Sequence, residues 1–208
     1  GLRGRNRRHR VIWGGVDLER YPMRTEPTHV GSAVFLGRVL PHKGIHFLIE
    51  GLPPGIPLHV VGPATDPAYL QRLQEMAKEK DVRFHGAIPD AEVVEILGRS
   101  MALVHPTPVD AAGSAGVNEL FGLALVEAMA RGCPVIASDA ASLPEIVEPE
   151  ASGLLVPPND PAAIGAALER LREDGDLWRR LSAGARRRVE ERFTWERVVD
   201  RCLEAYGA

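Results

Sequence analysis

Short apolar runs alternate with longer amphipathic stretches along most of the chain. Val34–Leu36, for example, precedes a stretch from Ile45 to Leu52 in which apolar residues recur three and four apart, as on one helix face. The same pattern predicts strands at residues 58–61, 82–85, 101–105, 134–137 and 153–156, and helices at residues 66–77, 90–97, 122–131, 160–171, 177–189 and 194–206. Apolar strands between helices indicate a parallel sheet buried on both faces. The sequence therefore predicts a single α/β domain with a doubly wound, Rossmann-like parallel sheet.

Two of the predicted helices carry an explicit start signal. Asp66-Pro67 and Asp160-Pro161 each combine a residue that caps a helix with a proline, which fits the first helical turn. In a doubly wound sheet, ligands bind beyond the carboxyl ends of the strands, where loops enter helices. Residues that directly follow the predicted strands are therefore the candidates for a functional site.

The composition is that of a folded protein in water. Of the 208 residues, 45% are apolar and 25% are charged, and the net charge of −3 provides no overall basic field for nucleic acid. No transmembrane segment is expected, because no apolar run approaches the roughly 18 residues that span a bilayer. Two cysteines, Cys133 and Cys202, are too few for a disulfide framework and favour a reducing compartment. We therefore expect a cytoplasmic protein; peripheral contact of the full-length protein with the inner face of the membrane stays open.

The first ten residues differ from the rest because half of them are arginine: Arg3, Arg5, Arg7, Arg8 and Arg10. The chain also begins with Gly1 instead of methionine. An expression scar, an arm that binds nucleic acid or lipid, and a linker cut from a longer protein all fit such a start. Short exposed runs of charge are usually solvated chain, so the cut linker is the favoured interpretation.

A loop with two glycines and two cations follows the first predicted strand. It runs from Gly37 to Gly44 and contains Arg38 and Lys43, directly before a helix start. Glycines allow the backbone to approach a ligand, and two cations beside the positive end of a helix dipole suit a diphosphate. A surface turn with two solvated cations is the alternative interpretation.

Two carboxylates bracket another junction between a loop and a helix. Glu119 lies in the loop and Glu127 lies more than one turn inside the predicted helix, so they stand roughly 10 Å apart along its axis. The amides of Phe121, Gly122 and Leu123 lie between them and are free for an anion. Carboxylates that can accept hydrogen bonds from hydroxyl groups thus lie on both sides of an anion site, which matches the layout of a nucleoside-diphosphate sugar. The alternative is an acid at a helix start and an ordinary surface glutamate, although the neighbours of Glu127 are almost all apolar.

These motifs resemble those of the group-1 glycosyltransferases (glycosyltransferase family 4), which are retaining enzymes of the GT-B architecture. The resemblance is strongest in Glu119, Glu127 and the following stretch Ala128–Ala137, and it extends over nearly the whole chain. The first strand's loop, Gly37–Gly44, resembles the phosphate loop of the family. Other segments resemble family markers in the correct order, namely Val11–Asp17 as an opening strand and turn, Val82–Gly86, Leu143–Val147 and Phe193–Glu196.

The resemblance implies a role for each matching residue. Arg38 and Lys43 would neutralise the donor diphosphate as the glycosidic bond breaks. Glu119 would hold hydroxyls of the transferred sugar, which makes these three the predicted catalytic residues. Glu127 would accept hydrogen bonds from the two ribose hydroxyls. The remaining predicted substrate-binding residues lie in the loops around the phosphates, sugar and base: Gly37, Ala87, Ile88, Phe121, Gly122 and Leu123.

The family also implies which partners to expect. The donor would be a nucleoside-diphosphate sugar, linked to UDP, GDP or ADP, and no metal or other cofactor is expected. Residues 1–10 would be a linker or remnant, residues 11–192 the nucleotide-sugar-binding domain, and residues 193–208 a helix that packs on an amino-terminal acceptor domain missing from this chain. The fragment alone would then bind donor without transferring sugar. A nucleotide-sugar epimerase of the same architecture and a non-catalytic donor-binding subunit stay open as alternatives.

The chain also departs from the family pattern at several places, of which two are the most visible. Residues 107–118 form a longer loop than the family usually has, and Trp13 stands where the family usually has proline. Neither change affects the two glutamates or the two cations. They bear on the identity of the donor more than on donor binding itself.

Overall fold

The computed structural model describes residues 12–24, 29–110 and 121–207 of the chain. Within these residues, the centre of the fold is a parallel six-stranded sheet in the order β3-β2-β1-β4-β5-β6. The strands are β1 (Ala33–Leu36), β2 (Leu58–Val61), β3 (Val82–Gly86), β4 (Ala102–His105), β5 (Val135–Ser138) and β6 (Leu154–Val156). This arrangement confirms the predicted doubly wound α/β fold.

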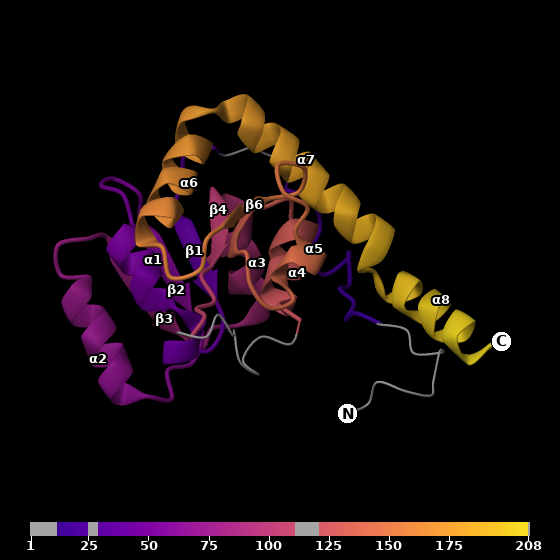
Figure 1. The fold of residues 1–208 in the computed structure, drawn as a ribbon, viewed down its shortest axis with the longest axis horizontal. Coiled ribbons are helices and arrows are strands. Elements are labelled where there is room, and N and C mark those ends of the chain that lie inside the picture. The colour runs from indigo at the N-terminus through magenta and orange to yellow at the C-terminus, as the bar shows by residue number, and fades with distance from the viewer. Residues whose placement is uncertain (1–11, 25–28, 111–120, 208) are drawn as a thin grey trace.

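Helices cover both faces of the sheet (Figure 1). One face packs against α1 (Ile45–Gly51), α2 (Pro67–Met76) and α6 (Pro161–Glu173), and the other packs against α3 (Asp90–Arg99), α4 (Leu123–Ala130) and α5 (Leu143–Ile146). A 3₁₀ turn, η1 (Pro41–Lys43), precedes α1, while α7 (Gly175–Arg192) contributes side chains to both hydrophobic clusters. The last helix, α8 (Trp195–Tyr206), projects beyond the sheet (Figure 1).

Side chains along β1 alternate between the two faces. Ala33 and Phe35 belong to the core that contains α1, whereas Val34 belongs to the core that contains α4, and all three are almost completely buried. Successive side chains of a strand point to opposite faces, so a strand covered on both sides is apolar at every position. This requirement explains the continuous apolar runs from which the strands were predicted.

Both predicted cap-and-proline starts are confirmed. The Asp66 carboxylate accepts a hydrogen bond from the Tyr69 amide over 3.0 Å, and the Asp160 carboxylate accepts one from the Ala163 amide over 2.9 Å. Such a bond satisfies an amide that has no partner within its own helix, and it stabilises the helix by about 1 kcal/mol. The two capped helices, α2 and α6, therefore begin where the sequence predicts.

The opening segment is not the strand that the family resemblance implies. Among residues 12–17, only Val16 forms a β-bridge, an isolated one with Thr194, and its amide donates to the Phe193 carbonyl over 2.8 Å. These partners belong to the junction between α7 and α8, which cannot continue a ladder of strand hydrogen bonds. The sequence also carries no signal for α5, because four residues are too few to show helical periodicity.

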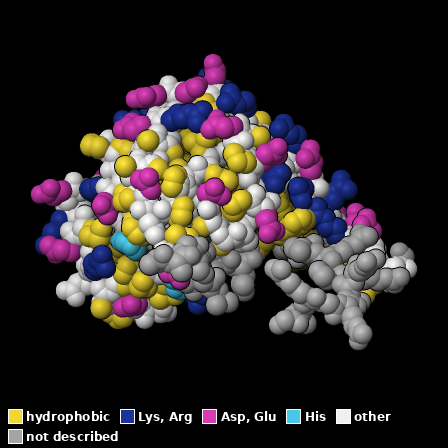
Figure 2. Space-filling model, in the orientation of Figure 1, with side chains coloured by type: hydrophobic (Ala, Val, Ile, Leu, Met, Phe, Trp, Pro, Cys, Tyr) yellow, Lys and Arg dark blue, Asp and Glu magenta, His cyan; other side chains and the backbone are white. Residues whose placement is uncertain are grey.

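The amphipathic helix α8 leaves its apolar side exposed. Trp195, Val199, Leu203 and Tyr206, spaced three or four residues apart, are 53%, 53%, 49% and 87% exposed. In the view of Figure 2, acidic and basic side chains are interspersed among apolar ones on the surface of the molecule. In the part of the chain that the structure describes, no helix has both the length and the apolar character needed to cross a bilayer.

Gly62, which follows β2, is expected to tolerate no side chain. An added β-carbon would lie 1.9 Å from the Gly37 carbonyl oxygen, and the backbone angle φ of Gly62 is +136°. We expect Gly62→Ala to lower the free energy of unfolding by about 2–4 kcal/mol, since a clash with backbone adds to the conformational strain.

Gly55→Ala is the matched control for this substitution. Gly55 also has a positive φ, +77°, but an added β-carbon would meet only the Arg172 side chain at 3.8 Å. Its expected loss is therefore about 1 kcal/mol, from the backbone conformation alone. Denaturant unfolding of both variants measures the difference, and equal losses would show that the contact at Gly62 is not restrictive.

Candidate functional site

The carboxyl ends of β1 and β4 mark the point at which the sheet changes direction. These two strands are neighbours, and their connections leave toward opposite edges, from β1 to β2 and from β4 to β5. The loop after β1 and the chain after β4 approach so closely that a β-carbon at Gly44 would lie 1.9 Å from the Pro106 carbonyl oxygen. Doubly wound folds bind ligands at such a switch point.

The two predicted cations, Arg38 and Lys43, belong to the loop at this switch point. Gly37 follows β1 directly and donates its amide to the Val61 carbonyl over 2.9 Å. The next residue, Arg38, is exposed. Lys43 is half-buried at the end of η1, and the following Gly44 adopts a left-handed conformation at the start of α1. The structure thus places both cations in one short loop at the carboxyl edge of the sheet.

The N-cap of α4 is a glycine, which has no side chain of its own to cap the helix. This residue, Gly122, has a φ of +83°. Leu123 is exposed, and Phe121 is half-buried with its ring centroid 6.0 Å from that of Phe193. Amides at a helix start carry the positive end of the helix dipole and suit an anion. Glu119 lies outside the described residues, so its predicted position relative to this helix start stays a prediction.

Glu127 lies in the second turn of α4 and is half-buried. Burial raises the pKa of its carboxyl group above the ordinary value, although a hydrogen bond from the Tyr21 hydroxyl and the nearby Arg20 guanidinium lower it. Tyr21 is almost completely buried, and its own pKa is raised by burial and by the charge of Glu127. Glu127 is therefore not an ordinary surface glutamate.

The predicted nucleobase segment follows β3. Ala87 is exposed, and Ile88 is half-buried against the core that contains α3 and α4. Two residues later, Asp90 begins α3 and forms an ion pair with Arg20. Arg20 is next to Tyr21, and both side chains lower the pKa of the α4 carboxylate. Two consecutive residues of the 12–24 segment therefore interact with both the start of α3 and the site acid on α4.

No sequence pattern indicates the roles of Arg20 and Tyr21. They lie in a segment without periodicity, and their partners on α3 and α4 are distant in sequence. Spacing rules relate residues within one element or across one turn, so they cannot connect Tyr21 to Glu127. Only the path of the folded chain brings this pair together.

Comparison with known proteins identifies the family. Residues 25–188 match the family model described as glycosyl transferases group 1. This chain belongs to the group-1 glycosyltransferases. A glycogen synthase from Mycobacterium tuberculosis is 29% identical over 95% of this chain and 48% of its own length. The chain accordingly spans about half the length of the curated relatives that it matches.

Solved structures share the fold of this group-1 glycosyltransferase chain. HepE from Anabaena, solved in complex with UDP and glucose, has a TM-score of 0.81 at 23% identity, over 95% of this chain and 56% of HepE. The carboxyl-terminal domain of a group 1 family glycosyl transferase (LpcC) from Francisella tularensis has a TM-score of 0.73 at 24% identity, over 87% of this chain and 100% of that domain. The fold is therefore that of the carboxyl-terminal domain of GT-B glycosyltransferases.

Two cavities of this glycosyltransferase domain are lined by residues other than the predicted donor residues. One, of about 350 Å³, lies beside α3 and contains the rings of His59 and His85, whose facing nitrogens are 2.8 Å apart. Burial and the neighbouring His85 lower the pKa of His59. In the described part of the chain, no three His, Cys, Asp or Glu side chains are grouped so that they could hold a metal ion.

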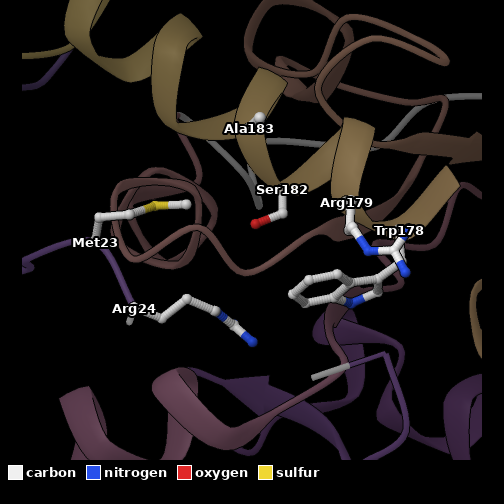
Figure 3. Close-up of a pocket in the computed structure, with 6 residues that line it drawn as sticks. All are labelled: Met23, Arg24, Trp178, Arg179, Ser182 and Ala183. Atoms are coloured by element: carbon white, nitrogen blue, oxygen red, sulfur yellow. The ribbon is translucent and has the colours of Figure 1, made fainter. Parts of the chain in front are cut away.

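The second cavity, of about 190 Å³, lies between residues Met23 and Arg24 on one side and α7 on the other (Figure 3). Arg24 lines it and donates a hydrogen bond over 3.0 Å to the carbonyl of Ser100, two residues before β4 begins. This position is the amino end of the strands, opposite the switch point. The cavity is lined by Met23, Arg24, Trp178, Arg179, Ser182 and Ala183.

Glu127→Gln is expected to stabilise the free protein at neutral pH. Because folding raises the pKa of Glu127, the folded chain binds its proton more tightly than the unfolded chain does, and stability falls as pH rises through the folded pKa. Glutamine carries no charge to bury, so the variant should have the higher unfolding midpoint at neutral pH. The difference should shrink toward acid pH, where Glu127 is protonated in the wild type.

Thermal unfolding of both proteins over a series of pH values measures this effect. Glu79→Gln is the control, because Glu79 is exposed beyond the end of α2. A Glu127→Gln variant that is less stable than the wild type at neutral pH would mean that the carboxylate supports the fold.

Proposed function

We propose that this chain is the donor-binding domain of a retaining glycosyltransferase and that it holds a nucleoside-diphosphate sugar beside the switch point of β1 and β4. The observation that carries the proposal is the combination of a two-cation loop, a helix start with glycine at its N-cap and a half-buried carboxylate, Glu127. Cations and backbone amides bind a diphosphate, and a carboxylate binds a ribose by accepting hydrogen bonds from its two hydroxyl groups. HepE, which shares the fold, was solved with UDP and glucose.

Each group has a distinct role in this proposal. Arg38 and Lys43 offset the charge that grows on the leaving diphosphate as the glycosidic bond breaks. The first amides of α4 bind a phosphate oxygen, and Glu127 accepts hydrogen bonds from the two ribose hydroxyls. Residues 87–88 contact the nucleobase through backbone atoms, and Glu119 holds hydroxyls of the transferred sugar, as the family resemblance implies. The scheme involves neither a metal nor a further cofactor.

Acceptor binding and transfer are proposed for the full-length protein. The curated relatives are about twice as long as this chain, and the family resemblance assigns the acceptor to an amino-terminal domain. We propose that the present domain binds the donor by itself and transfers sugar only together with such a domain. The same binding assay that tests the proposal discriminates among UDP, GDP and ADP.

At least one of UDP, GDP and ADP should raise the melting temperature at millimolar concentration, because a ligand that binds only the folded state stabilises it. Glu127→Ala should weaken that binding at least tenfold, since each hydrogen bond to a charged acceptor contributes about 1.5–3 kcal/mol. Glu79→Ala, the exposed control, should bind as the wild type does. Thermal shift followed by calorimetry measures both effects. The proposal fails if none of the three nucleotides binds the wild type.

Arg38→Gln should weaken the binding of the nucleoside diphosphate much more than the binding of the corresponding nucleoside. The exposed Arg38 is proposed to contact only phosphate, and charge-assisted bonds to phosphate are roughly twice as strong as neutral ones. We expect the affinity for the diphosphate to fall about tenfold and the affinity for the nucleoside to stay unchanged. Calorimetry with both ligands, with Arg72→Gln on the exposed side of α2 as control, measures this. Equal weakening of nucleoside and diphosphate would contradict a phosphate contact.

A further inference from the structure

Two half-buried histidine rings face each other at the edge of the sheet. His59 belongs to β2 and His85 to the edge strand β3, and both line the cavity beside α3. The Nδ1 atom of His59 is 2.8 Å from the Nε2 atom of His85, whereas the ring centroids are 5.0 Å apart. Because the centroids are much farther apart than the nitrogens, the two nitrogens lie between the rings and point at each other. An N–H···N hydrogen bond therefore joins the side chains of β2 and β3.

This contact has room for one hydrogen. A metal ion in line between the nitrogens would need about 2.0–2.1 Å to each of them, which the 2.8 Å separation does not allow. A neutral imidazole has one nitrogen that donates and one that accepts, and a protonated ring can only donate. The hydrogen bond thus persists when both rings are neutral and also when only the donating ring is charged. A second proton places a hydrogen on both facing nitrogens and replaces the bond by a contact between like charges.

The charged groups around the rings come from α3, from β3 and from the residue before β3. Arg83 of β3 and the preceding Asp81 form an ion pair over 3.4 Å, and Arg99 and Glu95 of α3 form another over 3.9 Å. Glu92 of α3, which is exposed, also lines the cavity. Since the two arginines offset two of the three carboxylates, these surroundings favour at most one positive charge on the two rings.

The energetics of the second proton follow from the same contacts. Burial and the charges of His85 and Arg83 lower the pKa of His59, whereas Asp81 raises it. In the unfolded chain, both histidines bind protons near the ordinary pKa of about 6.5. Stability falls with pH wherever the unfolded chain binds more protons than the folded chain. The two rings therefore stabilise the fold at neutral pH, and this stabilisation is lost as pH falls below about 6.5 toward the lowered pKa of His59.

The hydrogen bond lies where the edge strand leaves the sheet. His85 directly precedes Gly86, the last residue of β3, and β3 pairs only with β2 because it is the edge strand. The register between the two strands also shifts at this point, between Val60 and Val61. Residues 87–88, the proposed nucleobase segment, follow immediately. A side-chain bond at this position therefore supports the end of a strand that has a neighbour on one side only.

We propose that His59 and His85 form a pH-sensitive latch, which holds the carboxyl end of β3 against β2 at neutral pH and opens when a second proton binds on acidification. The latch itself depends only on the two rings and the two strands. Opening frees the residues that follow β3. Its effect on nucleotide binding rests on the proposed function, which assigns the nucleobase to residues 87–88.

Thermal unfolding from neutral pH to about pH 5 tests the latch. His59→Gln and His85→Gln each leave one ring, which takes up its proton without an opposing charge, so each variant should lose less stability on acidification than the wild type. The unfolding constant of the wild type should rise about tenfold more than that of either variant, the effect of one unit of pKa. His29→Gln removes a half-buried histidine outside the latch and should follow the wild type. If burial of His59 alone were responsible, His85→Gln would lose as much stability as the wild type, and this result would overturn the proposal.

Amide hydrogen exchange locates the opening. The Gly62 amide donates to the Gly86 carbonyl over 2.8 Å, after β2 and at the end of β3, and the Gly37 amide donates to the Val61 carbonyl over 2.9 Å, after β1 and at the end of β2. On acidification, the protection factor of Gly62 should fall in the wild type and persist in His85→Gln, because local opening exposes the amide to exchange. Gly37, the internal control, should stay protected in both proteins. A Gly62 amide that stays protected in the acidified wild type, or that loses protection together with Gly37, would show that β3 is not released locally and would overturn the latch.

Neither measurement involves nucleotide, so a failure of the latch is distinguishable from a failure of the proposed function. Local opening in a protein that binds none of UDP, GDP and ADP would support the latch and reject the donor site. For a nucleotide that binds, calorimetry should show that its affinity falls more steeply on acidification in the wild type than in His85→Gln. Parallel profiles would reject the connection between the latch and residues 87–88.

Discussion

The close approach of two loops at the centre of the sheet is the constraint on which the candidate site depends. β1 and β4 are paired neighbours, and the chain leaves them toward opposite edges. Gly44 fits beside the Pro106 carbonyl, and Gly62 fits beside the Gly37 carbonyl, only because neither has a β-carbon. These contacts hold the loop that carries Arg38 and Lys43 against its neighbours, so the two cations lie at the switch point rather than on a mobile turn.

Glu127 illustrates how a binding residue can conflict with packing. The rest of its helix is strongly apolar, and Leu125, Val126, Ala128 and Met129 are completely buried. Loss of water around the carboxylate penalises its charged form, and the Tyr21 hydroxyl and Arg20 compensate only part of that penalty. Hydroxyl groups of a bound ligand would compensate more of it. A group that costs stability in the free protein and is relieved by a ligand is typical of functional sites.

The Trp13 side chain is one of the groups that attach α8 to the domain. The guanidinium carbons of Arg192, at the end of α7, and Arg201, in α8, lie 4.8 Å and 4.6 Å from the centroid of the Trp13 ring. The Trp13 indole nitrogen donates to the Glu145 carboxylate over 2.9 Å, and the ring meets Phe193 edge-on. No residue of α8 is fully buried, so the helix is held by these contacts and by the packing of Trp195 against Gly15, rather than by a core face.

The sequence by itself determined the class of the fold, the type and order of most elements, and the loops in which the candidate residues lie. It could do so because apolar periodicity reports which side chains are buried, and because all strands of a parallel sheet end at one edge. It could not determine that Val16 pairs with Thr194 instead of opening the sheet, or that Tyr21 and Arg20 meet Glu127 and Asp90. A local sequence pattern indicates whether a side chain is buried, whereas the residues that it contacts depend on the path of the whole chain. Only the tertiary structure decided those pairs.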